Sequence, residues 1–584
     1  MTRLTSPANR RTGAGGQGRR RLLRLRATAA AGLLLLGLAS QAQAIDSTIS
    51  VNNSRTGWDA NEPNLSPAQV SSSSFGQRWS TAVSGAVEGQ PLVTGRHVIV
   101  ATENNYVYGI DAVTGQKNWT RQLGPTWPTS AVNCSSPASS TGITSTPVYD
   151  HASNTVYLTS KVNDGADVQH PHWYFHALDA STGAERAGWP VRIQGTPTNS
   201  PGHPFNAFTS LQRAGLLLLN GWVYAGFGSL CDHAPYVGQV VGVRTASRRL
   251  TLWSAEAGTD NQGAGIWQSG GGLVSDGPGR IFLSTGNGFG TGSSPSPGPG
   301  NKPPGRLGES VVRLGVNSDG SLSARDFFSP ANNKTLDDHD RDLGSGGPVA
   351  LPGSFGTAAH PHLLVQVGKD GRVFLLDRNN LGGMGQGPNG TDKPVSVAGP
   401  FEGVWGHPGV WGGGGGYVYT VAANGGSPLR ALKFRVNSSG IPTLTSVGTS
   451  NEGFGYGSGS PVVTSNGTTG GSALVWVVFS GSGSTTGGAL RVYDAVPVNG
   501  VMHLRRSFPI GTAYGFVVPA TDGGRVYVGT SSGHVVAFGA AAPPSGTAGA
   551  ASGTADPPAG TAGPSSGTQT GGCRPCGGSD QYGS

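Results

Sequence analysis

Short stretches in which apolar and polar residues alternate, separated by glycine turns, recur along most of this chain. In the clearest example, residues 98–102 and 106–110 alternate β-branched or aromatic side chains with other residues. A period of two in such residues is typical of β-strands. Asp111 then begins a turn in which Gly115 supplies the positive φ, and Trp119 follows on a third strand. This piece of sheet has an uncovered face, so it needs further sheets to pack against.

The chain supplies those sheets as repeats. A strand that starts with small residues, a glycine turn, a second and a third strand, and commonly a fourth recur eight times, about 61 residues apart. The pattern predicts an all-β fold: an eight-bladed β-propeller of four-stranded antiparallel blades. The first strands begin near Gly89, Thr144, Gln212, Gln268, Leu343, Gly406, Gly457 and Gly515.

The two ends of the repeat region are predicted to join. The last repeat stops at residues 534–539 without a fourth strand, and the strand-like segment at residues 75–83 has no repeat of its own. We therefore expect the N-terminal strand at 75–83 to complete the last blade. Closing the ring in this way removes sheet edges, which otherwise promote aggregation.

Outside the repeats the chain divides into further parts. Residues 1–44 combine a basic region, an apolar run at 29–39 and a small-x-small site at 42–44, which are the features of an export signal. Gly18-Arg19-Arg20-Arg21 resembles a twin-arginine signal, and an arginine-rich Sec signal explains the same residues. The expected parts are the export signal at 1–44, a polar lead-in at 45–74, the propeller at 75–539 and a disordered Gly/Pro/Ser/Thr/Ala-rich tail at 540–584.

The charge of the chain argues against several classes of function. The formal charge of +8 equals the eight arginines of residues 1–44, which contain no acidic residue, so the rest of the chain is neutral overall. There is thus no electrostatic case for binding nucleic acid or an anionic membrane. The apolar run of the signal is too short to span a bilayer comfortably, so no transmembrane span is expected in the mature chain. We expect an extracytoplasmic protein, secreted or held in a periplasm or at a cell surface.

Four cysteines in an exported chain favour two disulfides. We pair Cys134 with Cys231 because both fall in loops of neighbouring repeats, and Cys573 with Cys576 because they are close together in the tail. A lone Cys-x-x-Cys pair is too little for a zinc site.

Two of the repeats resemble a known family. VYGIDAVTGQKNW at residues 107–119 and FHALDASTGAERAGW at residues 175–189 are similar to the tryptophan-docking repeat of pyrroloquinoline-quinone (PQQ) propellers, the quinoprotein alcohol dehydrogenase-like family. The resemblance extends over about residues 54–539 and is weak in the repeats that lack the terminal tryptophan. It implies structural roles in locking neighbouring blades, and it does not by itself show that PQQ binds. Those roles fall on Asp111, Gly115, Trp119, Asp179, Gly183 and Trp189.

Ligand sites of propellers usually lie at the channel rim, where loops enter the innermost strands. The residues at these places are rich in aromatic, amide and imidazole groups, which suit a planar cofactor or a sugar through stacking and hydrogen bonds. Packing between blades explains most aromatic residues of such repeats equally well. The candidate rim residues are Gln90, Gln212, Trp267, Gln268, Trp405, His407, Trp411 and Tyr456.

The acidic run at residues 337–342 is the densest charge cluster in a charge-poor chain. Carboxylates such as Asp338 and Asp340 could hold Ca²⁺, and the resemblance implies Ca²⁺ beside PQQ in quinoprotein dehydrogenases. Asp340 and Asp342 are the candidates for the catalytic base of that family. A solvated loop with internal Asp–Arg pairs is the simpler explanation of the run.

These observations leave two functions open. The first is an exported scaffold that binds a protein, glycan or small-molecule ligand through its channel rim, as the related outer-membrane assembly scaffold binds protein partners. The second is a PQQ- and Ca²⁺-dependent dehydrogenase of alcohols or sugars. This chain lacks the adjacent cysteine pair of proteins that resemble methanol dehydrogenase, and it lacks a haem c attachment site. These departures favour the scaffold, whereas the aromatic and amide-rich rim favours the enzyme.

Overall fold

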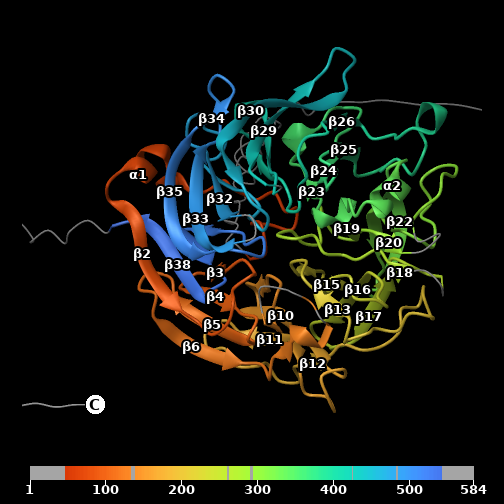
Figure 1. Ribbon diagram of the computed structural model, residues 1–584, viewed down its shortest axis with the longest axis horizontal. Coiled ribbons are helices and arrows are strands. Elements are labelled where there is room, and N and C mark those ends of the chain that lie inside the picture. The colour runs from red at the N-terminus through yellow and green to blue at the C-terminus, as the bar shows by residue number, and fades with distance from the viewer. Residues whose placement is uncertain are drawn as a thin grey trace, which may run out of the picture. The chain divides into compact units, whose positions relative to one another are not determined.

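The computed structural model describes residues 47–541, except 133, 135–138, 259–261, 290–293, 424 and 482–483. These residues belong to one compact unit, Met1–Ala541. Its strands form small sheets that succeed one another around a ring, in chain order from red to blue (Figure 1). The predicted fold class is confirmed: the ring has eight blades. The predicted signal at 1–44, the pair Cys573–Cys576 and all but the first two residues of the predicted tail lie outside the described residues.

The first four blades follow the chain from the inside of the ring to the outside. In blade 3 two short strands share the innermost position, and in blade 4 that position is reduced to a bridge between Val274 and Phe282. Blade 1 contains β3 (Leu92–Thr94), β4 (His97–Ala101), β5 (Tyr106–Asp111) and β6 (Lys117–Gln122); blade 2 contains β9 (Val148–Asp150), β10 (Thr155–Val162), β11 (His172–Asp179) and β12 (Val191–Arg192). Blade 3 contains β13 (Ser210–Gln212), β14 (Leu217–Leu219), β15 (Trp222–Ser229), β16 (Gln239–Arg244) and β17 (Leu250–Ser254); blade 4 contains β19 (Arg280–Ser284), β21 (Val311–Val316) and β22 (Leu322–Phe328).

The other four blades follow the same order, and blades 6 and 7 each gain a short parallel strand. Blade 5 contains β23 (Val349–Ala350), β24 (Leu363–Val367), β25 (Val373–Asp377) and β26 (Ser396–Ala398); blade 6 contains β27 (Gly409–Trp411), β28 (Tyr417–Val421), β29 (Ser427–Val436), β30 (Pro442–Phe454) and the added β34 (Val501–Met502). Blade 7 contains the added β1 (Trp58–Asp59), β31 (Val462–Thr464), β32 (Leu474–Gly481), β33 (Ser484–Asp494) and β35 (Leu504–Thr512). Blade 8 contains β36 (Ala520–Asp522), β37 (Arg525–Gly529), β38 (His534–Ala540) and β2 (Phe75–Ala82).

The elements outside the blades are short. The hairpins β7 (Trp127–Pro128) with β8 (Ser140–Thr141), and β18 (Gln262–Gly263) with β20 (Gly288–Phe289), lie in connecting loops. The α-helices are α1 (Pro67–Ser71) and α2 (Asn333–Asp338), and the 3-10 turns are Pro63–Leu65, Thr129–Val132, Leu343–Ser345, Gly353–Phe355, Pro388–Gly390 and Gly413–Gly415. No helix of the described ranges is long and apolar enough to cross a bilayer.

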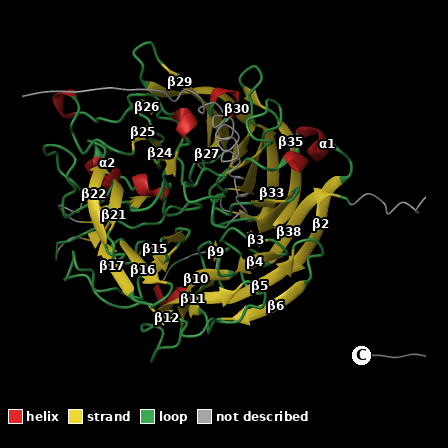
Figure 2. Ribbon diagram, turned by 180° about the vertical axis from the view of Figure 1, so that it is seen from behind, coloured by secondary structure: helices red, strands yellow, loops and turns green. Residues whose placement is uncertain are grey.

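The ring closes as predicted. β2 pairs antiparallel with β38, with Phe75 opposite Ala540 and Ala82 opposite His534. The two strands lie side by side in both views, red-orange against blue in Figure 1 (Figure 2). Trp79 of β2 also binds the next blade, because its indole N–H donates to Ala112 O at 3.3 Å.

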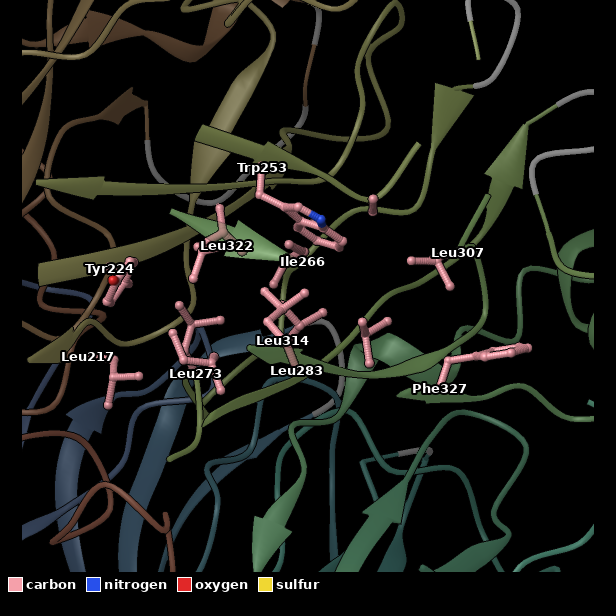
Figure 3. Close-up of a cluster of buried hydrophobic side chains, with 14 of the residues drawn as sticks. Leu217, Tyr224, Trp253, Ile266, Leu273, Leu283, Leu307, Leu314, Leu322 and Phe327 are labelled. Atoms are coloured by element: carbon pink, nitrogen blue, oxygen red, sulfur yellow. The ribbon is translucent and has the colours of Figure 1, made fainter. Parts of the chain in front are cut away.

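The blades are held together by apolar layers. Between blades 3 and 4, Tyr224 and Trp253 of one sheet meet Leu314 and Phe327 of the other (Figure 3). Trp119 of blade 1 donates from its indole to Ala180 O of blade 2 at 3.1 Å. Such layers arise because each sheet buries the apolar half of its alternating residues on a neighbour.

The first part of the lead-in lies in the central channel. Residues 47–59, here called the channel segment, accept backbone hydrogen bonds from the innermost strands of blades 2, 5, 6 and 7 in turn, through the pairs Tyr149–Ser47, Ala350–Ser54, Val410–Thr56 and Val463–Gly57, 2.6–3.0 Å long. Arg55 is fully buried and donates to Leu216 O of blade 3 and to Leu273 O before blade 4. The segment therefore fills the space that the eight blades leave around the axis.

Candidate functional site at the channel rim

An aromatic patch lies where blades 6, 7 and 8 meet the channel rim. Trp405, Tyr456, Tyr514 and Phe516, here called the rim patch, come from the loops that enter the innermost strands. Tyr456 lies at the centre, 5.8 Å from Trp405, 6.1 Å from Tyr514 and 5.4 Å from Phe516 between ring centroids. Its side chain is 39% exposed. The patch therefore offers ring surface to a ligand that stacks.

An ion pair closes the rim beside this patch. Arg213, between β13 and β14 of blade 3, binds Glu88, before blade 1, at 3.0 Å, and it donates to Gly515 O, before blade 8, at 2.5 Å. Its guanidinium carbon lies 5.2 Å from the centre of the Phe516 ring. One side chain thus joins three blades over the channel, and the cavity between it and the channel segment has a volume of only about 10 Å³.

A rim pocket of about 370 Å³ lies between blades 8 and 1. This volume falls in the range of small-molecule sites. Its lining combines hydroxyl, amide and carboxyl groups with one ring of the rim patch, and includes Glu88, Glu103, Asn104, Ser140, Tyr514 and Ser532. Such groups suit a ligand with several hydroxyls. Sequence reasoning missed Glu103 and Asn104, because they lie in a strand-connecting turn that resembles any other turn of the repeats.

The surroundings of Glu103 in this pocket favour its protonated form. Burial raises the pKa of Glu103 to about 8, and the charge of Glu88 acts in the same direction. One carboxyl oxygen accepts from Gly142 N at 2.7 Å. A neutral carboxylic acid can donate as well as accept a hydrogen bond, so the pocket carries a donor that a carboxylate would not supply.

The predicted glutamine and histidine rim residues lie one layer below. Gln90, Gln212, Gln268 and His407 are at most 2% exposed. Gln90 accepts from Ser50 N of the channel segment at 2.9 Å, and Gln268 accepts from Ser284 N at 3.0 Å. Their side chains bind the channel segment and neighbouring backbone and are shielded from solvent.

His407 is the residue of this layer with the clearest electrostatic signature. Its Nδ1–H donates to Pro408 O at 2.6 Å, and Nε2 faces the Ser50 hydroxyl of the channel segment. Burial lowers the pKa of His407 to about 4, and nearby Arg55 contributes to the lowering. The ring is therefore neutral at physiological pH.

The two remaining predicted tryptophans pack between strands. Trp267 is half-buried, donates to Ser229 O at 2.8 Å and packs edge-on against Tyr236 at 5.8 Å. Trp411 is fully buried in β27, donates to Gly467 O and stacks on Tyr417. Trp411 thus belongs to the core of blade 6 and not to the exposed rim, the alternative that the sequence left open.

The acidic run forms a cluster around Lys369. The ammonium lies 2.5 Å from Asp342 and 2.9 Å from Asp340. Asp342 is buried and also accepts from Asn287 N at 2.7 Å, whereas the side chain of Asp340 is 70% exposed. Asp338 instead binds Lys334 on the surface. The three candidate aspartates therefore have three different environments.

Burial and ion pairing act in opposite directions on the pKa values of this cluster. Burial raises the pKa of Asp342, while Lys369 opposes the rise. Burial also raises the pKa of Glu309 well above its usual range, and the charge of Asp342 adds to this effect. Burial alone would lower the pKa of Lys369, but Asp342 and Asp340 raise it.

The residues do not fit Ca²⁺ and PQQ in the arrangement that the resemblance implies. Lys369 already occupies the oxygens of Asp340 and Asp342 that a cation would need. Within the described ranges, no group of three or more His, Cys, Asp or Glu side chains is arranged to hold a metal. A planar tricyclic quinone on the axis would meet the Arg213–Glu88 pair and the channel segment, where about 10 Å³ is free. The Ca²⁺ and PQQ assignments stay predictions, and no step is derived through them.

A buried relay elsewhere has the order of a nucleophile, a base and an acid. Ser160 Oγ lies 2.9 Å from His176 Nε2, and His176 Nδ1 lies 3.0 Å from Glu185 Oε2. Ser160 is fully buried and His176 is 3% exposed. Because no substrate reaches a buried hydroxyl, the relay links β10, β11 and the following turn structurally.

The disulfide between Cys134 and Cys231 is present, with Cα atoms 5.9 Å apart. It links the loop after blade 1 to the loop between β15 and β16 of blade 3. Disulfides of this kind persist in oxidising compartments, so the bond agrees with export.

Comparison with known proteins finds one family model that matches part of the chain. This model, of PQQ type and described as outer membrane protein assembly factor BamB, matches residues 69–210, which form the lead-in helix and the first blades of the eight-bladed propeller. A sequence comparison with curated proteins finds no match.

Several solved structures share the propeller fold of this chain. Quinohemoprotein alcohol dehydrogenase from Comamonas testosteroni matches with a TM-score of 0.56 and 16% identity, over 87% of this chain and 83% of that chain. A europium-containing methanol dehydrogenase matches with a TM-score of 0.55 and 13% identity, over 85% and 98%. BamB from Moraxella catarrhalis matches with a TM-score of 0.47 and 12% identity, over 80% and 99%. At these identities the likeness shows the fold alone.

Proposed function

We propose that this protein is an extracytoplasmic binding propeller that receives a glycan or another polyhydroxylated ligand at its channel rim. One observation carries the proposal: the channel is filled from within by residues 47–59 and bridged by Arg213, while the rim pocket beside them stays open. Binding at the rim therefore needs no movement of the ring.

The chemistry of the rim pocket supports this ligand class. Hydroxyl, amide and protonated carboxyl groups can exchange hydrogen bonds with sugar hydroxyls in both directions. The rings of Tyr514 and Tyr456 present flat apolar surface next to those groups. Saccharides present hydroxyls at their edges and C–H groups on their faces, so both kinds of surface are used.

Neutral oligosaccharides provide the direct test. Maltohexaose, cellohexaose and chitohexaose are titrated separately into the mature protein by calorimetry and followed by tryptophan fluorescence. At least one should bind saturably. Tyr456→Ala should weaken that binding about tenfold, because it removes the central ring of the rim patch, whereas Tyr456→Phe should retain it. Absence of saturable binding for all three sugars, or equal affinity of the Ala and Phe variants, would reject the rim as a saccharide site.

The dehydrogenase alternative is tested with its own cofactors. The mature protein is mixed with PQQ and Ca²⁺, and quinone absorbance and dye reduction are measured with simple alcohols and sugars. We expect neither stoichiometric quinone binding nor turnover, because the axis is filled and Lys369 occupies the aspartate oxygens. Saturable quinone binding with turnover would replace the proposed function by a dehydrogenase.

A further inference from the structure

A second cavity, of about 610 Å³, lies between blades 2 and 3. Here it is called the interblade pocket. Its walls are the loop before β11 (169–172), the stretch after β12 (192–194), the loop 202–210 and the turn 235–239 between β15 and β16, with Gln262. The volume lies in the middle of the range of small-molecule sites.

Three backbone carbonyl groups of the loop 202–210 accept hydrogen bonds from buried side chains of neighbouring strands. Gln239 donates to His203 O at 2.9 Å, Trp173 donates to Ala207 O at 3.2 Å, and Lys161 donates to Phe208 O at 2.7 Å. These three donor side chains are at most 3% exposed. A loop fastened in this way keeps its shape without a ligand, which reduces the ordering cost of binding.

Lys161 holds the loop 202–210 at a cost in desolvation free energy. Its ammonium is buried with the carbonyls of loop 202–210 and lies 3.5 Å over the Trp127 ring. Burial lowers the pKa of Lys161 well below its usual range. Trp127 in turn packs edge-on against Phe208 and belongs to the same small apolar cluster as Cys134 of the disulfide. The pocket wall is thus held by a buried lysine, an aromatic ring and a covalent bond.

The polar side chains that line the interblade pocket are basic or uncharged. None of the residues that line the interblade pocket, all of which are described, is acidic. Arg192 is exposed and forms no ion pair with a described residue. His170 and His172 bind Asp167 and Asp164 through Nδ1, which leaves each Nε2 for another partner. The amides of the lining are Gln169, Gln194, Asn206, Gln239 and Gln262.

We propose that the interblade pocket binds an acidic saccharide, with Arg192 holding its carboxylate. An arginine without an acidic partner provides a charge-assisted site for that group. Amides and imidazole nitrogens suit hydroxyls, and Phe205, which is held edge-on by Phe227 at 5.0 Å, provides a ring for the sugar face. This site shares no lining residue with the rim pocket and does not depend on the function proposed for it.

Trigalacturonate is the probe, with neutral galactotriose and inorganic phosphate as comparison ligands. Calorimetry on the mature protein should show saturable binding of trigalacturonate at least about tenfold tighter than binding of the other two. Arg192→Gln should weaken trigalacturonate about tenfold or more and leave galactotriose unchanged. Arg121→Gln is the matched control, because Arg121 is an exposed arginine on β6, the outermost strand of blade 1, as Arg192 lies on β12 of blade 2.

Each other outcome overturns the proposal in a specific way. If galactotriose binds as tightly as trigalacturonate, the carboxylate contributes nothing to binding. If phosphate binds as tightly as trigalacturonate, the pocket is a simple anion site. Equal losses in Arg192→Gln and Arg121→Gln indicate a long-range charge effect and not a contact. No binding of trigalacturonate rejects the site outright. Since Tyr456→Ala leaves this pocket intact, failure here and failure at the rim are distinguished.

Discussion

His407 shows at the residue scale how a polar side chain becomes part of the core. Its place before an innermost strand predicts a position at the channel rim, and in the structure the ring lies below the rim, 1% exposed. Whether the ring faces a ligand or the protein depends on Ser50, 357 positions earlier in the chain. The same limit applies to Gln90 and Gln268, whose partners are backbone groups that a repeat pattern does not reveal.

The neutral state of His407 predicts a pH dependence of stability. Its pKa is about 4 in the folded protein and 6.5 for an ordinary histidine in water, so the unfolded chain binds the proton more tightly. The stability that this ring contributes is complete above about pH 6.5 and is lost as the pH falls towards 4, by about 3 kcal/mol. Denaturant unfolding of the wild type and of His407→Gln between pH 7 and 4 measures the difference. Parallel pH profiles of the two proteins would contradict the assignment.

The close packing of Gly115 against Trp79 of β2 predicts that a side chain at position 115 destabilises the ring closure. It has a φ of +75°, and an added Cβ would lie 2.7 Å from the Trp79 ring of β2. Gly95 has a similar φ of +69° but nothing within 4 Å of an added Cβ, so it is the matched control. Alanine at either position is strained by the positive φ. Gly115→Ala should lower the unfolding free energy by roughly 1–3 kcal/mol more than Gly95→Ala, because only its Cβ meets a neighbouring ring. Equal losses in denaturant unfolding would show that the Trp79 contact is not tight.

At the scale of elements, the repeats were predictable and the channel segment was not. The strands follow from alternation and glycine turns, and the pairing of β2 with β38 follows from a missing strand at one end and a surplus strand at the other. Residues 47–59 show no such pattern, and their partners are spread over the blades. A polar lead-in therefore gives no local signal that it will be buried.

The channel segment predicts that the ring depends on its own N-terminal residues. Deletion of residues 45–57 should lower the midpoint of thermal unfolding by more than about 5 °C, because the backbone donors of four innermost strands lose their partners. A synthetic peptide of residues 47–57 added to the deletion variant should recover part of the loss by mass action. A scrambled peptide of the same composition is the control. An unchanged midpoint, or equal effects of both peptides, would show that the segment is dispensable.

At the scale of the whole molecule, the disulfide links the loop after blade 1 covalently to a loop of blade 3. Its cysteines are 97 positions apart, and a closed loop of that length restricts the unfolded chain strongly. The pairing was predictable from the repeat positions of the two loops. The interblade pocket above it was not, because its shape depends on how the loop 202–210 is held by three different strands.

The Cys134→Ser/Cys231→Ser double variant should therefore lose about 2–4 kcal/mol of unfolding free energy. Reductant should destabilise the wild type by the same amount and leave the double variant unchanged. In unreduced, denatured wild type, neither of these two thiols should react with an alkylating agent, which peptide mapping can establish. Reaction at both positions would contradict the bond.

The channel segment also has a consequence for how the molecule is made. A ribosome delivers residues 47–59 before any blade, yet Asp59 accepts a hydrogen bond from Thr521, which is synthesised 462 residues later. The contacts of Asp59 must therefore wait until the last blade has emerged. Contacts of such long sequence separation form slowly, so an early part of the chain is among the last to find its place.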